Sequence, residues 1–92
     1  MDKFKEIETK GFQEDLSQDF GGQQKRIIQK LQQYVYPQLR TQPYFGLHIK
    51  KLKNYKPDTW RYRIGDYRFF YEIDEKNHLV IMIAAENRSD AY

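Results

Sequence analysis

The residues most able to do chemistry are three arginines that flank a predicted reversal of the chain. Arg61 and Arg63 precede the dipeptide Gly65–Asp66, and Arg68 follows it. This dipeptide is typical of a two-residue hairpin turn, which would place Arg63 directly opposite Arg68. Directly opposed side chains share one face of a sheet, so the three guanidinium groups would lie together. A guanidinium stays charged and matches phosphate oxygens, so the cluster predicts a phosphate-binding patch.

A second interpretation is that acids within the fold neutralise these arginines. Like charges placed directly opposite each other destabilise a sheet, and Glu72, Glu86 and the C-terminal carboxylate are candidates to compensate them. Lysines on the preceding segment favour a binding function, because some of them would extend the positive surface. They are Lys50, Lys51 and Lys53. Bends predicted after this segment leave open which lysines face the arginines.

Charge is unevenly distributed along the chain. The 92 residues carry a formal net charge of +3. Residues 48–68 hold seven basic and two acidic residues, and residues 21–47 hold four basic residues and no acid. The two ends, residues 1–20 and 69–92, each carry a net charge of −3. The basic block is either a solvated surface or a footprint for a polyanion or an acidic protein partner.

Length and composition exclude several classes of protein. Ninety-two residues suffice for a single domain, residues 1–92, with one small core. The absence of cysteine excludes disulfides, thiolate metal sites and cysteine nucleophiles. No apolar run approaches the length of a membrane span, and the first residues lack the apolar core of a signal peptide, so we expect a cytoplasmic protein without membrane contact. Without a metal-binding motif or a glycine-rich phosphate loop, we expect no metal and no cofactor.

The first half of the chain predicts two helices. Thr9 is a candidate N-cap of the first helix, and Gly21–Gly22 would end it. A second helix is expected from about Gln23 to Tyr36, with Pro37 stopping it. The apolar residues of the first helix recur every four residues, at Phe12, Leu16 and Phe20, and would share one face. The expected apolar stripe of the second consists of Ile27, Ile28, Leu31, Tyr34 and Val35. Because Gly21–Gly22 is so short a link, we expect the two helices to form an antiparallel hairpin.

After an irregular segment, residues 37–46, the apolar period changes to two and predicts strands. We expect a short strand around Leu47–Leu52, the arginine-bearing hairpin, a turn at 74–77 and a central strand over His78–Ala85. Residues 3–8 could add an edge strand. The core face of the hairpin would carry Trp60, Tyr62, Ile64, Tyr67, Phe69, Tyr71 and Ile73. The fold expected is α+β, an N-terminal α-helical hairpin packed on one face of a C-terminal antiparallel β-sheet.

Two segments resemble the heart of the RelE/ParE toxin superfamily. They run from Lys51 to Tyr55 and from Trp60 to Asp74, and Asn87–Tyr92 resembles the motif that closes the sheet in RelE-type members. The likeness covers nearly the whole chain and implies a RelE-like two-layer domain. It also implies the toxin of a bacterial type II toxin–antitoxin system, with a cognate antitoxin and a toxin–antitoxin hetero-oligomer. RelE-like members cleave messenger RNA on the ribosome, whereas ParE-like members poison DNA gyrase.

The resemblance also assigns roles by position. Arg68 matches the arginine that contacts the scissile phosphate, and Arg61 and Arg63 match basic residues of the first core strand. Arg88 and Tyr92 match basic and aromatic residues of the closing segment. Just before Arg88 the chain departs from many relatives. Glu86 and Asn87 stand where those relatives carry a histidine or a further basic residue, which leaves the general acid unassigned.

Metal-free RNA cleavage is the chemistry that such residues support. The 2′-hydroxyl attacks the adjacent phosphorus and expels the 5′-oxygen, and we assign charge stabilisation to Arg68 and Arg63. Glu86 is a candidate base, with a salt bridge as its alternative role, and Tyr92 would stack on a base or donate a proton. The residues expected to hold neighbouring phosphates are Arg61, Lys50, Lys51 and Lys53. His48 lies near this basic strand and stays outside the predicted site.

Three functions stay open at this point. The arginine cluster favours an endoribonuclease toxin that acts on messenger RNA. A ParE-like inhibitor of DNA gyrase needs no cluster that cleaves phosphodiesters. A catalytically weak toxin would act mainly as a co-regulator that binds its antitoxin.

Overall fold

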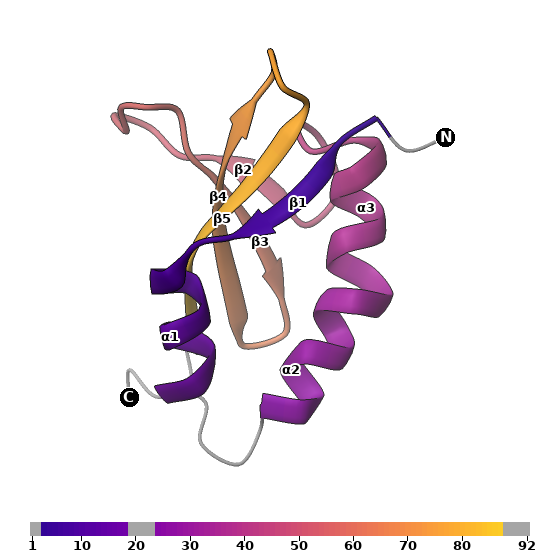
Figure 1. The fold of residues 1–92 in the computed structure, drawn as a ribbon, viewed down its shortest axis with the longest axis vertical. Coiled ribbons are helices and arrows are strands. Elements are labelled where there is room, and N and C mark those ends of the chain that lie inside the picture. Colours follow the sequence, from indigo (N-terminus) through magenta and orange to yellow (C-terminus); the bar gives the residue numbers. More distant parts are fainter. Residues whose placement is uncertain (1–2, 19–23, 88–92) are drawn as a thin grey trace.

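Residues 3–18 and 24–87 form two layers in the computed structural model of the chain, a five-stranded sheet and helices on one of its faces (Figure 1). The strands are β1 (Lys5–Glu8), β2 (Ile49–Lys51), β3 (Trp60–Ile64), β4 (Tyr67–Asp74) and β5 (Leu79–Asn87). The helices are α1 (Lys10–Gln18), α2 (Gln24–Lys30) and α3 (Tyr36–Thr41), with the π-helical segment η2 (Leu31–Val35) between the last two.

The sheet has the strand order β1-β5-β4-β3-β2. Strands β2 to β5 form the expected antiparallel meander, and the strand expected within residues 3–8 is present at the edge as β1. β1 runs parallel to β5, so the complete sheet is mixed. The described part of the chain therefore has the predicted α+β architecture, with one parallel edge strand added.

Helix α1 begins where the sequence predicted. The backbone N–H of Phe12 donates a hydrogen bond to the Thr9 hydroxyl oxygen at 3.2 Å, which is the contact of an N-cap. Phe12 and Leu16 are buried on the side of α1 that faces the sheet. The remaining predictions for this region, the apolar role of Phe20 and the Gly21–Gly22 link, lie outside the described residues.

The second helix does not stop at Pro37, and this prediction was wrong. α2, η2 and α3 follow one another without a break up to Thr41. Proline in an α-helix lacks a donor and its ring clashes with the carbonyl four residues earlier. Here the N–H of Tyr36 bonds to the carbonyl of Leu31, five residues back, and this wider π turn admits Pro37 at the start of α3. Residues 37–41, expected to be irregular, are therefore helical.

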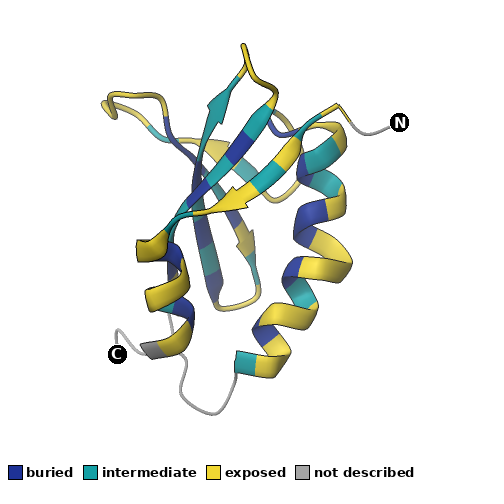
Figure 2. Ribbon diagram, viewed as in Figure 1, coloured by how far each residue is buried: buried dark blue, intermediate teal, exposed yellow. Residues whose placement is uncertain are grey.

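The apolar stripe of this long helix is narrower than predicted. Ile27, Leu31 and Val35 are buried against the sheet, and Leu39 continues the row (Figure 2). Ile28 and Tyr34 were expected in the same stripe, but they are 43% and 55% exposed. None of the helices within residues 3–18 and 24–87 has the length and apolar character needed to cross a membrane.

The core face of the sheet agrees with the predicted alternation. Trp60, Tyr62, Tyr67, Phe69 and Tyr71 are buried, and Ile64 and Ile73 are partly buried at its ends. Strand β5 contributes Val80, Met82 and Ala85. The step of three residues between Met82 and Ala85 reflects a bulge, because Phe70 pairs with Ala84 whereas Tyr71 pairs with Met82.

Candidate nucleic-acid interface

The β3–β4 hairpin has the register that the turn predicted. Ile64 pairs with Tyr67 across the turn and Arg63 pairs with Arg68. Gly65 has a φ of 57° at the first central position of this turn, where glycine avoids the strain of a side chain. The residues that alternate with the arginines are buried under the helices. Arg61, Arg63 and Arg68 therefore lie together on the opposite face, which we call the open face.

The predicted lysines separate into three places. Lys50 pairs with Arg61 across β2 and β3, so it joins the arginines on the open face. Lys51 pairs with Trp60 and lies on the other side of the sheet, where its Nζ is 3.3 Å from an Asp58 carboxylate oxygen. Lys53 is exposed in the segment between β2 and β3. The structure thus brings Lys50 to the arginines, and Lys51 and Lys53 lie elsewhere.

A shallow hollow of about 520 Å³ lies over β2 and β3 beside this cluster. Lys50, Arg61 and Arg63 line it, and Gly65 borders it at the turn. His48 also lines the hollow, with its ring 5.5 Å from that of Tyr62. His48 was not among the site residues predicted from the sequence. The signal that could have found it is its spacing of two residues from Lys50, because residues two apart along a strand share a face. Burial raises the pKa of Tyr62, so its hydroxyl stays protonated at neutral pH.

Two donors of the cluster are buried without a partner among residues 3–18 and 24–87. They are the Nε atoms of Arg61 on β3 and Arg68 on β4, and both side chains lie on the open face. A buried donor left without a hydrogen bond costs roughly 1–3 kcal/mol. Because both atoms are shielded from solvent, an anion recovers this energy only by turning the guanidinium groups outward so that Nε meets an acceptor. The open face therefore has charge and unsatisfied donors at the same place.

Glu86 partly neutralises the cluster. It pairs with Arg68 across β4 and β5, and its Oε1 lies 2.7 Å from Nη2 of Arg68. The Glu86 side chain is 50% exposed and the Arg68 side chain is 28% exposed. The alternative role considered for Glu86, a salt bridge, is therefore present in the structure. Glu72 also lies on the open face, two residues beyond Phe70 along β4, and it pairs with Ile81 of β5.

The bulge in β5 explains why Glu86 reaches the arginines. Between the β4–β5 turn and the bulge, Tyr71 pairs with Met82 and Glu72 with Ile81. Continuing that register would place Ala85 opposite Arg68 and turn Glu86 towards the core. The extra residue, Ile83, shifts the pairing by one, and a shift of one residue exchanges the two faces of a strand. Ala85 is thereby buried and Glu86 lies on the open face.

Most of the predicted closing segment, Asn87–Tyr92, lies outside the described residues. Arg88 and Tyr92, which resemblance assigned to the site, lie outside the described residues. Within residues 3–18 and 24–87, no three His, Cys, Asp or Glu side chains form a group that could hold a metal ion. The chemistry available on the described open face is that of Lys50, Arg61, Arg63 and Arg68 with Glu86. These residues can bind and stabilise phosphate oxygens.

Comparison with protein families gives a match over most of the chain. Residues 8–92 match the family described as the ParE toxin of type II toxin–antitoxin system, parDE. The comparison with curated proteins found no match.

Solved structures with the same fold come from toxin–antitoxin complexes. The complex RelBE2 from Mycobacterium tuberculosis contains a chain with a TM-score of 0.77 and 23% identity, covering 98% of this chain and 97% of that one. A chain of the archaeal RelE–RelB complex from Pyrococcus horikoshii has a TM-score of 0.65 and 19% identity, with 94% and 96% covered. A chain of the RelB–RelE antitoxin–toxin complex from Methanococcus jannaschii has a TM-score of 0.56 and 28% identity, with 94% of each chain covered.

Proposed function

The chain belongs to the ParE toxin family of type II toxin–antitoxin systems, within the RelE/ParE superfamily, and we propose that it is an endoribonuclease toxin that cleaves messenger RNA on the ribosome. The observation that carries the proposal is the grouping of Lys50, Arg61, Arg63 and Arg68 on the open face, with two of its buried guanidinium donors unpartnered. A structural role gives little reason for such a group, because opposed like charges destabilise a sheet.

The proposed reaction uses the RNA's own 2′-hydroxyl as nucleophile. Its oxygen attacks the adjacent phosphorus, the bond from phosphorus to the 5′-oxygen breaks, and a 2′,3′-cyclic phosphate remains. Arg68 and Arg63 would stabilise the charge that develops on the phosphate oxygens. Arg61 and Lys50 would hold the neighbouring phosphates along β3 and β2.

Proton transfer is assigned to residues at and beyond the end of β5. Glu86 would take the proton of the 2′-hydroxyl when RNA displaces its ion pair with Arg68. Arg88 would add charge to the site, and Tyr92 would stack on a base or protonate the leaving oxygen. Lys51 and Lys53 would contact RNA only beyond the open face, since neither lies on it with the arginines.

Inhibition of DNA gyrase is the second candidate. It is favoured by the family that residues 8–92 match and by the Arg68–Glu86 ion pair, which reduces the free positive charge on the open face. A toxin of this kind needs a surface for a protein partner and no cleavage chemistry. The third candidate is a catalytically weak toxin that acts mainly by binding its antitoxin.

Controlled expression in growing bacteria distinguishes these functions. Wild type, Arg63→Gln and Arg68→Gln are compared with Arg26→Gln, which removes the same charge from an exposed position on α2. For the endoribonuclease we expect rapid loss of full-length transcripts, with cleavage slowed about a hundredfold in each site variant and unchanged in Arg26→Gln. A DNA-damage response with intact transcripts would instead support gyrase as the target. Absence of any growth effect would leave only antitoxin binding.

A further inference from the structure

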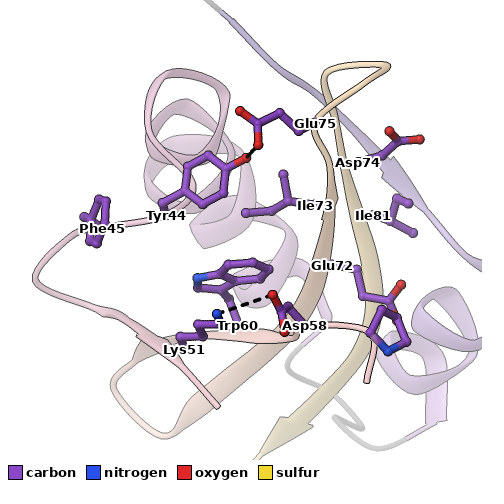
Figure 3. Close-up of a pocket in the computed structure, with 11 residues that line it drawn as sticks. Tyr44, Phe45, Lys51, Asp58, Trp60, Glu72, Ile73, Asp74, Glu75 and Ile81 are labelled. Carbon is purple, nitrogen blue, oxygen red and sulfur yellow. Dashed lines mark hydrogen bonds and ion pairs between the residues drawn. The ribbon is translucent and has the colours of Figure 1, made fainter. Parts of the chain in front are cut away.

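A second hollow lies at the opposite end of the hairpin from the turn, and we call it the aromatic cleft. Its volume is about 720 Å³ (Figure 3). Tyr44 and Phe45 line it from the segment after α3, and Trp60 from the start of β3. Glu72–Glu75, at and just after the end of β4, complete the lining, with Ile73 on the Trp60 side and the Glu72 and Asp74 side chains pointing to the other side of the strand (Figure 3). The open-face arginines do not line this cleft.

The aromatic cleft exposes apolar surface from residues that are firmly held. The rings of Tyr44 and Trp60 pack edge to face with centroids 5.7 Å apart. The Tyr44 hydroxyl also donates to a Glu75 carboxylate oxygen at 2.9 Å. Beside them Phe45 is 75% exposed, although a phenylalanine gains most when buried. A fixed aromatic floor with an exposed aromatic rim is typical of surfaces that bind a partner.

The charges around this cleft are opposite in sign to those of the arginine cluster. Four acids line it, namely Asp58, Glu72, Asp74 and Glu75, against one lysine, Lys51. Lys51 is held by Asp58, and its Nζ lies 5.6 Å from the centre of the Trp60 ring. The Trp60 ring thus already contacts one cation. On β4, Asp74 accepts two hydrogen bonds from Asn77, and Glu72 remains to attract a second cation. The complementary ligand carries a positive charge next to apolar groups.

The end of β4 also presents backbone on one side. β3 begins at Trp60, which pairs with Tyr71, so within the described part of the chain Glu72–Asp74 pair with β5 alone. β4 lies between β5 and β3 in the sheet, and the side without β3 adjoins the cleft residues Asp58 and Trp60. An extended peptide suits such a strand edge, because its backbone can form hydrogen bonds there.

We propose that the aromatic cleft binds an extended segment of the cognate antitoxin and receives an arginine or lysine side chain that is flanked by an apolar residue. The proposal rests on the chain being the toxin of a toxin–antitoxin system and is independent of RNA cleavage. The cation would lie beside the Glu72 carboxylate, on the face of β4 opposite Trp60, and the flanking apolar residue, which points the other way along an extended segment, would cover Phe45 on the Tyr44 side. The antitoxin would then occupy the end of the hairpin away from the turn, without covering the arginine cluster.

The experiment uses the full chain in complex with its antitoxin. The chain has no cysteine, so Phe45→Cys introduces a unique thiol at the rim of the cleft. Tyr55→Cys is the matched control, because Tyr55 is 54% exposed on the segment between β2 and β3 and does not line the cleft. The rate of reaction with a maleimide is measured with and without antitoxin. We expect a reduction on the order of tenfold for Phe45→Cys and little change for the control, because a bound segment excludes the reagent.

Charge-neutral variants test the cation directly. In Glu72→Gln and Glu75→Gln one acid is lost while the shape of the side chain is kept, and Glu14→Gln on α1 is the control for the charge itself. Antitoxin affinity, measured by calorimetry, should fall about twofold to fivefold in each cleft variant and remain unchanged in the control.

Three results would overturn the proposal. The first is a Phe45→Cys thiol that reacts equally fast in the complex. The second is unchanged antitoxin affinity in both cleft variants. The third is protection of the thiol in toxin alone that grows with toxin concentration, since a second copy would then cover the cleft. None of these readouts involves RNA, so they leave the proposed endoribonuclease activity to its own test.

Discussion

Removing the charge of Glu86 should strengthen RNA binding at the open face. The Glu86 carboxylate lies 2.7 Å from a terminal nitrogen of Arg68, so it occupies a place that a phosphate oxygen would take. Glu86→Gln keeps the length of the side chain and removes the competitor. An RNA phosphate bound to Arg68 would otherwise lie about 5 Å from this carboxylate, where repulsion in water amounts to roughly 0.8 kcal/mol.

The loss of the ion pair contributes a second term. A partly exposed pair of this kind is worth roughly 0.2–1 kcal/mol, which the wild type gives up when RNA displaces Glu86. Taken together, about 1 kcal/mol is a conservative sum, and it corresponds to about fivefold tighter binding. The same change at Glu14 on α1, in the helix layer on the other side of the sheet, should alter affinity far less, because salt screens charges beyond a distance of about 10 Å.

Fluorescence anisotropy with a short single-stranded RNA measures this effect. Replacing the 2′-hydroxyls by 2′-O-methyl groups allows binding without cleavage. Unmodified RNA then separates binding from chemistry, because a catalytic base at position 86 predicts tighter binding with slower cleavage in Glu86→Gln. Equal or weaker binding of the variant would refute the competition and show that Glu86 instead holds Arg68 in its binding orientation.

Three further predictions concern the elements that position the open face. Gly65→Ala should lower the free energy of unfolding by about 1 kcal/mol, because a side chain at a φ of 57° is strained although its Cβ would meet nothing within 4 Å; denaturant unfolding measures this. Tyr71→Phe should lower the same free energy by roughly 1 to 3 kcal/mol, since it leaves the buried Pro43 carbonyl without the hydroxyl that donates to it at 2.6 Å, and an unchanged midpoint would contradict this bond. Thr9→Ala should cost about 1–2 kcal/mol through loss of the α1 cap and of the hydroxyl bond to the Met82 carbonyl, whereas Thr9→Ser should restore most of it; thermal unfolding of the pair checks the role of the hydroxyl.

The arginine-bearing hairpin could be predicted because its determinants are local. Two turn residues set the register, and the alternation of aromatic and basic residues then assigns the faces. The structure has this register from Ile64↔Tyr67 to Trp60↔Tyr71. The arginine cluster followed from the sequence for the same reason.

The features that the sequence did not predict depend on contacts distant in the chain. Helix α3 continues beyond Pro37 because a π-helical turn admits the ring and because Leu39 is fully buried against the core. The bulge at Ile83, which brings Glu86 to Arg68, depends on packing along β5. Lys50 and Lys51 were assigned together, but their faces depend on how a segment of eight residues, 52–59, returns the chain to β3.

The most direct test of the account observes the arginine side chains themselves. In nuclear magnetic resonance spectra, each arginine Nε–H gives its own signal, and the 2′-O-methyl RNA can be titrated into the protein. We predict that the Nε–H signals of Arg61, Arg63 and Arg68 shift on binding, because phosphate bound at their guanidinium groups changes the surroundings of each Nε–H, while those of Arg26 and Arg40 in the helix layer stay unchanged. RNA binding that leaves the three open-face signals in place, or that shifts the helix-layer signals instead, would contradict the assignment of the open face as the phosphate site.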